Sequence, residues 1–164
     1  MRKLILPAAL LLPLALGTAA CGDEDGASQA SSPAPAAGKV AQAAKRTTTV
    51  KVMKTRYGRI LVDGNGRALY LFTRERGPTA RCYGACAGAW PVFYARGQVK
   101  AGSGPSRKLI GTMQRRDGRR QVTYKGHPLY YYVSDRKPGQ VTCQDVTEYG
   151  GTWLVVAPSG NAIT

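Results

Sequence analysis

Two segments of this chain match each other, and this internal repeat constrains the fold more than any other feature. Leu69–Glu75 (LYLFTRE) pairs with Leu129–Asp135 (LYYYVSD) at an offset of 60 residues. A β-branched run and a glycine turn precede each segment, and an apolar run centred on Trp90 or Trp153 follows it. A hairpin followed by a third apolar strand, occurring twice, is the simplest arrangement that this order predicts.

The repeat predicts a mainly β fold: a small antiparallel β domain made of two related halves, at about 57–95 and about 110–158. Gly66 and Gly118, in Asn-Gly and Asp-Gly pairs, are suited to hairpin turns because glycine accepts positive φ. Only 81–89, which is rich in small residues without β-branching, is compatible with one short helical turn. Aromatic residues at period two in the strands indicate core or cross-strand packing.

The N-terminal region predicts export. Arg2 and Lys3 precede the apolar run Leu4–Leu16, and small residues follow it. This run is shorter than the roughly 20 residues that a membrane-spanning helix needs. We therefore expect residues 1–20 to be a cleavable signal peptide.

Cys21 stands directly after this region, in the sequence GTAAC. Small residues that lead into a cysteine resemble a lipobox, although Thr18 occupies the place where the usual lipobox has leucine. The resemblance implies that Cys21 is acylated, with chains such as palmitate, and anchors the protein to the outer face of the cell membrane; the alternative is an ordinary secretory signal followed by a plain thiol. Residues 21–45, rich in Ala, Ser, Pro and Gly, predict a disordered tether to a β-rich domain at 46–164.

The expected domain is strongly basic. Residues 46–164 hold 20 lysine and arginine residues against six acidic residues, a net charge of about +14. Such a charge favours anionic partners, which outside the cytoplasm are lipid headgroups or cell-wall polymers. Aromatic residues are not interleaved with the densest basic cluster, which argues against nucleic acid. That cluster, expected to be exposed at a hairpin tip as either a solvated turn or an anionic contact site, is Arg115, Arg116, Arg119 and Arg120.

Four motifs in order carry a family resemblance: YLF at 70–72, CYGACAGAWP at 82–91, VTYKGHPLYY at 122–131 and GGTW at 150–153. Together they resemble the secreted-repeat lipoproteins of bacteria, which are described by a Tyr-x-aromatic-x-x-Asp motif and whose function is undetermined. The resemblance implies an extracytoplasmic address and the β fold, and it brings no catalytic residues. The residues on which the pattern falls are Tyr70, Phe72, Glu75, Trp90, His127, Tyr130, Tyr132, Asp135 and Trp153. The second copy fits in full, whereas the first has Glu in place of the motif Asp.

Three cysteines remain if Cys21 is acylated. Cys82 and Cys86 are four residues apart and suit a disulfide if the segment between them turns. Cys143 departs from the family pattern and occupies a place comparable to Cys82, which leaves it a free or redox-active thiol, or a partner in another bridge or a dimer. A Cys₃His zinc set with His127 lacks the usual two closely spaced pairs. We expect no metal or cofactor, and a turn-capping role for His127.

No catalytic constellation is present. The chain has a single histidine, no nucleophile elbow, no phosphate-cradling glycine loop and no close pair of carboxylates. We therefore expect a lipid-anchored, non-enzymatic envelope module that binds anionic surfaces or partner proteins. The alternative is a redox or cofactor-binding accessory protein that uses thiol–disulfide exchange, a metal or haem.

Overall fold

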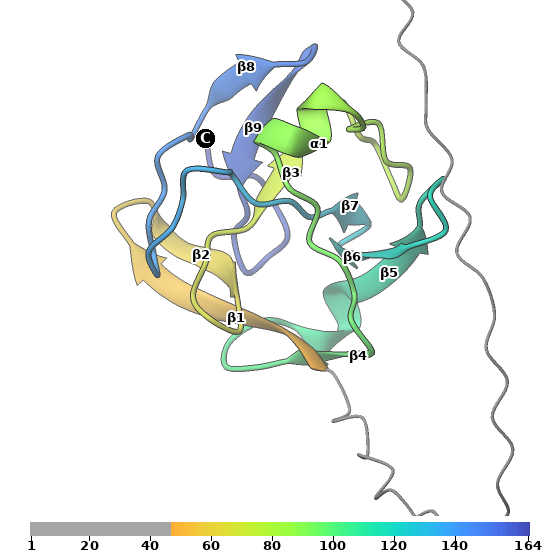
Figure 1. Ribbon diagram of the computed structural model, residues 1–164. Helices are drawn as coiled ribbons and strands as arrows, with labels where there is room; N and C mark the ends of the chain where they lie inside the picture. Colours follow the sequence, from red (N-terminus) through yellow and green to blue (C-terminus); the bar gives the residue numbers. More distant parts are fainter. Residues whose placement is uncertain (1–46) are drawn as a thin grey trace, which may run out of the picture. The chain divides into compact units, whose positions relative to one another are not determined.

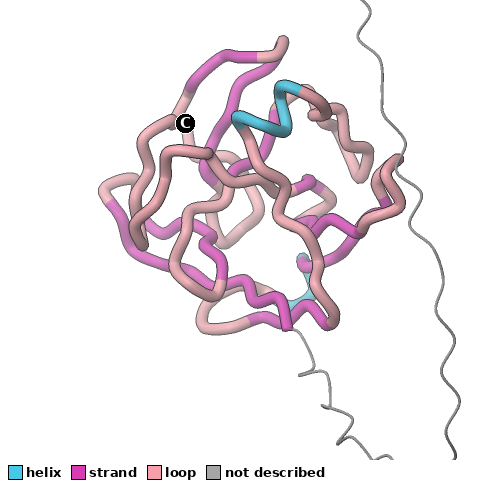
Figure 2. The backbone as a smooth tube through the Cα atoms, viewed as in Figure 1, coloured by secondary structure: helices cyan, strands magenta, loops and turns pink. Residues whose placement is uncertain are grey.

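The computed structural model describes residues 47–164; the expected signal peptide, Cys21 and the tether lie outside the described residues. Within this range the chain forms three small sheets and one short α-helix (Figures 1 and 2). This confirms the mainly β fold that the repeat predicts. Across the same residues, no helix is long and apolar enough to cross a membrane.

A run of β-branched residues builds the first sheet, which has the order β2-β1-β4. β1 (Thr47–Thr55) pairs antiparallel with β2 (Gly58–Asp63) and parallel with β4 (Gln98–Ala101). Sequence reasoning missed β1, which begins ten residues before the expected start of half one. It also missed the parallel pairing, because β4 lies in the connection between the halves and carries no repeat signal.

The other two sheets each contain short strands from the repeat regions. The second sheet has the order β3 (Tyr70–Phe72), β9 (Gly151–Val155) and β8 (Val146–Glu148). The third has the order β5 (Ile110–Gln114), β6 (Arg120–Tyr124) and β7 (His127–Pro128). A five-residue helix, α1 (Ala85–Ala89), forms inside the segment that was expected to turn helically, and a 3₁₀ turn, η1 (Arg107–Leu109), precedes β5.

The turn between β5 and β6 shows why glycine is required there. The Arg115 amide donates to the Arg119 carbonyl over 2.9 Å, and the Gly118 amide donates to the Arg115 carbonyl over 3.0 Å. Gly118 closes this turn with φ of 76°, a left-handed conformation that side chains disfavour. Gly66 has the same role between β2 and β3, with φ of 87°.

The two halves exchange their tryptophan-centred segments, although the run 90–94, which was predicted to be a strand, forms only isolated bridges at Val92 and Tyr94. β9 of the second half pairs with β3 of the first, with Val155 opposite Tyr70, while Val92 of the first half forms a bridge with Tyr130 of the second. Tyr70 and Tyr130 also face each other: each backbone amide donates to the other residue's carbonyl, over 2.9 and 3.0 Å. An internal pseudo-twofold axis therefore passes between the two tyrosines, and each half pairs with the tryptophan-centred segment of the other.

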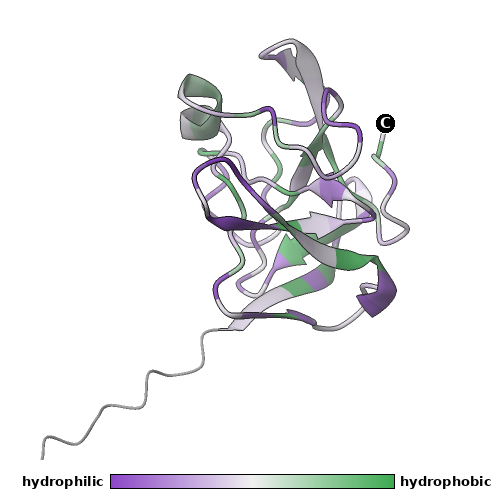
Figure 3. Ribbon diagram, turned by 90° about the vertical axis from the view of Figure 1, so that its right-hand side faces the viewer, coloured by the Kyte–Doolittle hydropathy of each residue, from purple (hydrophilic) through white to green (hydrophobic). Residues whose placement is uncertain are grey.

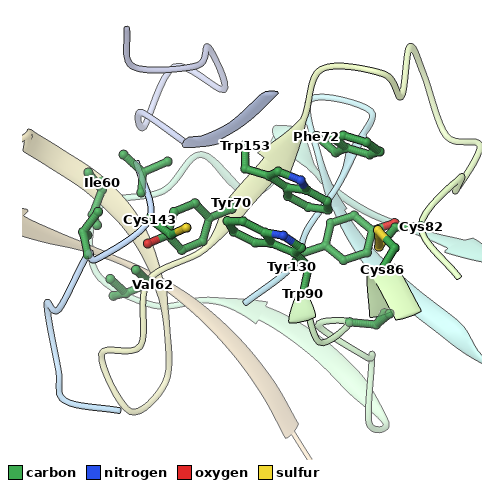
Figure 4. Packing of buried hydrophobic residues seen from close by; sticks show 14 residues of the cluster. Ile60, Val62, Tyr70, Phe72, Cys82, Cys86, Trp90, Tyr130, Cys143 and Trp153 are labelled. Atoms are coloured by element: carbon green, nitrogen blue, oxygen red, sulfur yellow. A yellow bond between two sulfur atoms is a disulfide. The ribbon is translucent and has the colours of Figure 1, made fainter. Parts of the chain in front are cut away.

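A column of four aromatic rings lies at the centre of this interlocked arrangement. Phe72, Trp153, Trp90 and Tyr132 follow one another with centroid separations of 4.2, 4.1 and 4.8 Å, so that rings of the two halves alternate. Figure 4 shows the first three of these rings. Both tryptophans are fully buried. Each aromatic pair contributes roughly 0.5–1.5 kcal/mol beyond the burial of its area. The column thus supports the interpretation of the period-two aromatics as core.

Candidate functional site

Each motif tyrosine donates its hydroxyl to the motif acid of the other half. The Tyr70 hydroxyl donates to Asp135 Oδ2 over 2.5 Å, and the Tyr130 hydroxyl donates to Glu75 Oε1 over 2.8 Å. All four residues are at most 1% exposed. The spacing of the Tyr-x-aromatic-x-x-acid motif is therefore explained by structure: Tyr70 lies in β3 and Tyr130 at the β-bridge opposite it, and each acid follows at the turn where it reaches the partner half.

Each motif acid also holds the loop that follows it. Glu75 Oε1 accepts the backbone amides of Arg81 and Cys82 over 2.6 and 3.2 Å. Asp135 Oδ1 accepts the amide and the hydroxyl of Thr142 over 2.9 and 2.6 Å. Glu75 thus performs the role of the motif aspartate in the first half, and Arg81 and Thr142 occupy equivalent places.

Burial keeps the two motif tyrosines in their hydroxyl forms, which donate to the motif acids. Burial raises the pKa of Tyr70, with a further increase from neighbouring Asp135, and burial likewise raises the pKa of Tyr130 beside Glu75. Burial also raises the pKa of Glu75, although the amide and hydroxyl donors to its carboxylate oppose that increase. These groups are fixed parts of the core, so none of them is presented to a ligand.

The structure contains the expected disulfide between Cys82 and Cys86, whose Cα atoms are 5.3 Å apart. Cys143 is a buried free thiol, and burial raises its pKa. Figure 4 shows it beside Tyr70, well separated from the disulfide beside Tyr130. The fold therefore does not bring the three cysteines together, and no group of three metal-binding side chains occurs within 47–164.

His127 lies at a hairpin turn. It begins β7 and pairs with Tyr124, after Lys125 and Gly126, which have positive φ of 51° and 81°. Its Nδ1 atom is buried and makes no hydrogen bond within the described part of the chain. The Cys₃His set is not assembled among residues 47–164.

The expectation that all four clustered arginines are exposed is wrong for Arg115, which is only 4% exposed. Its guanidinium donates to Gln121 Oε1 and to the Cys82 carbonyl, each over 2.6 Å, and to the Tyr130 hydroxyl over 3.3 Å. Side chains alternate along a strand, so Arg115 shares the inward face of buried Met113. This alternation was the sequence signal that could have identified the buried arginine.

Arg116 is exposed and packs on an aromatic ring. Its guanidinium lies 4.3 Å from the centroid of the Tyr83 ring, and Arg115 lies 4.2 Å from the same ring. The Arg116 backbone amide also donates to the Tyr83 hydroxyl over 3.3 Å, which fixes the backbone of Arg116 beside the same ring. Cation–π contact thus holds Arg116 at the surface in a defined position.

Arg119 and Arg120 are exposed on the other side of the same turn. Arg119 lies 4.0 Å from the centroid of the Tyr94 ring and forms an ion pair of 2.8 Å with Asp117. Arg120 donates to the Thr112 hydroxyl over 2.7 Å. The three exposed arginines form what we call the hairpin cluster, Arg116, Arg119 and Arg120.

Burial of acidic residues makes the surface more basic than the composition alone indicates. Asp63, Glu75 and Asp135 are buried, whereas Arg115 is the only buried residue among the lysines and arginines of 47–164. Hydrophilic residues accordingly gather on the outer strands and turns (Figure 3). Half of the six acids in this range thus contribute little to the surface, which carries a large excess of positive charge.

Residues 51–94 and 111–157 match the model of a lipoprotein family described as a secreted repeat of unknown function. The chain belongs to this family. Its two copies of the secreted repeat coincide with the two interlocked halves, and the family's character places the domain outside the cytoplasm. Comparison with curated proteins and with solved structures found no match.

Proposed function

We propose that this member of the secreted-repeat family is a non-enzymatic module, anchored through acylated Cys21 to the outer face of the membrane, that binds anionic envelope surfaces through its hairpin cluster. The observation that carries this proposal is the cluster itself: exposed Arg116 and Arg119 each packed on a tyrosine ring, in a domain that buries half of its acids.

Electrostatics sets the expected strength of this binding. A lysine or arginine near an anionic membrane surface contributes about 1 kcal/mol. Three arginines then contribute roughly 3 kcal/mol, which corresponds to about a hundredfold in affinity. Their ring contacts reduce the side-chain entropy lost on binding.

The buried motif supports a binding role in preference to a catalytic one. The four motif groups that could exchange a proton, Glu75, Asp135 and the two motif tyrosines, are buried in the core and hydrogen-bonded to each other. The separation of Cys143 from the disulfide likewise disfavours a thiol–disulfide site made from all three cysteines.

Co-sedimentation of residues 46–164 with phosphatidylglycerol vesicles, and with phosphatidylcholine vesicles as reference, tests the proposal. We expect R116S/R119S/R120S to lose at least about tenfold in affinity for the anionic vesicles. The matched control, K54S/R136S/K137S, removes the same charge from around the β1–β2 side, whose hairpin tip lies on the opposite side of the domain from the β5–β6 tip (Figure 1). Equal losses in both variants, or no loss in the first, would overturn the assignment to the hairpin cluster.

A further inference from the structure

A groove beside the hairpin cluster is lined by three arginine side chains and by no acidic side chain. It has a volume of about 460 Å³ and lies between the loop after Glu75 and the end of β5. Within 47–164, none of its three arginines forms an ion pair with a carboxylate. We call it groove A; its walls are formed by Arg74, Pro78, Thr79, Ala80, Arg81, Tyr83, Met113, Gln114 and Arg116.

The walls of groove A are held rigidly from beneath. Glu75 binds the backbone amides of Arg81 and Cys82, and buried Arg115 donates to the Cys82 carbonyl over 2.6 Å. The disulfide to Cys86 closes the same loop. A ligand that enters groove A therefore meets a loop that is already ordered, which lowers the entropy cost of binding.

The internal pseudo-twofold axis creates a second groove that serves as a comparison. This groove B is lined by Met53, Lys54, Thr55, Arg56 and residues 138–142. In the repeat alignment Ser134 stands where groove A has Arg74, and Thr142 makes the same backbone contact to a motif acid as Arg81. The fold thus forms this loop without either arginine, so Arg74 and Arg81 are not required for it.

The arginines of groove A suit a tetrahedral oxyanion. A guanidinium presents a planar fork of N–H donors that matches phosphate oxygens, and a phosphate has enough oxygens to accept from several such forks at once. Arg74 already donates to the Tyr149 carbonyl over 3.1 Å, which restrains it at the rim while leaving other N–H groups to donate. Arg116 is restrained by the Tyr83 ring.

We infer that groove A is a binding site for a phosphate group, held by Arg74, Arg81 and Arg116. The inference rests on the proposed function and deepens it, because it names the chemistry of the anionic ligand. The phosphate belongs either to a lipid headgroup or to a soluble or polymeric phosphate ester.

The first experiment titrates the ¹⁵N-labelled domain 46–164 with inorganic phosphate and with glycerol phosphate, using acetate at the same ionic strength as reference. We expect saturable chemical-shift changes at the amides of Thr79–Tyr83 and Arg116. The R74S/R81T variant replaces the two arginines with their groove B counterparts, and we expect its affinity for phosphate to be about tenfold lower. K54S/R56S removes two charges from groove B and is expected to bind phosphate as the wild type does. Absence of saturation, equal response to acetate, or equal weakening in both variants would overturn the inference.

A second arm identifies the source of the phosphate by measuring R74S/R81T on phosphatidylglycerol vesicles. Loss of vesicle binding together with phosphate binding assigns groove A to lipid headgroups. Loss of phosphate binding alone assigns it to soluble or polymeric phosphate esters. The broader proposed function is tested separately: it fails if R116S/R119S/R120S binds phosphatidylglycerol vesicles as tightly as the wild type does.

Discussion

Replacing Asp135 with asparagine isolates one half of the reciprocal tyrosine–acid contact. The side chain keeps its shape, and its amide oxygen can still accept from the Thr142 amide and hydroxyl that Oδ1 now binds. The amide nitrogen then faces the Tyr70 hydroxyl, which at present donates to Oδ2 over 2.5 Å. The tyrosine proton is left without an acceptor in a fully buried position.

The expected cost follows from this single loss. A hydrogen bond to a charged group contributes about 1.5–3 kcal/mol, and an unsatisfied buried donor is costly for the same reason. We expect Asp135→Asn to lower the free energy of unfolding by about 2–3 kcal/mol. At about 4 °C per kcal/mol for a domain of this size, Tm falls by about 8–12 °C.

Calorimetry of the domain at neutral pH measures this shift, and Asp145→Asn is its matched control. Asp145 is exposed with φ of 58°, a conformation that asparagine also accepts, so the same chemical change is expected to leave Tm nearly unaltered. A Tyr70→Phe/Asp135→Asn double variant is expected to be no less stable than Asp135→Asn alone, because the unpaired hydroxyl is gone. Equal Tm values for Asp135→Asn and Asp145→Asn would refute the structural role of the motif.

Three further changes test other parts of the core. Burial raises the pKa of Glu75 in the folded state, so its ionisation opposes folding. We therefore expect the free energy of unfolding of Glu75→Gln, measured by urea denaturation, to improve relative to the wild type as pH rises from about 4 to 7. A difference that stays constant with pH would contradict this. Arg115→Met leaves the Gln121 and Cys82 acceptors unpaired and is expected to cost about 3 kcal/mol in the same assay, whereas a neutral effect would show that the buried guanidinium is not needed. Cys86→Ser opens a short loop and is expected to cost about 2 kcal/mol, with the wild type losing as much on reduction.

Local patterns made much of the fold predictable. Period-two aromatic residues, paired glycine turns and the 60-residue repeat identified the strand at Tyr70 and the hairpin at Gly118, whereas the predicted strand around Tyr130 is reduced to isolated bridges. The four-residue spacing of Cys82 and Cys86 is similarly local, and the α1 turn brings the two together. These features depend on neighbours in sequence, which is the information that a pattern contains.

The remaining features depend on how the halves cross. A repeat indicates two similar units, but it does not say that each tyrosine binds the other unit's acid, because that contact joins residues 65 or 55 positions apart. Groove A is likewise made from loop 78–83 and the end of β5, which belong to different halves and are brought together by tertiary structure. The burial of Arg115 follows from the same contact, since its acceptor is a carbonyl of that loop.

The salt dependence of binding to phosphatidylglycerol vesicles is the most direct measure of whether ordered surface arginines confer the function of this protein. Between about 50 and 500 mM NaCl, screening shortens the reach of exposed charges severalfold. We expect the affinity of the wild-type domain to fall steeply over this range, and that of R116S/R119S/R120S to begin lower and to fall less steeply. A wild-type affinity that does not change with salt, or two parallel curves of equal height, would contradict the account.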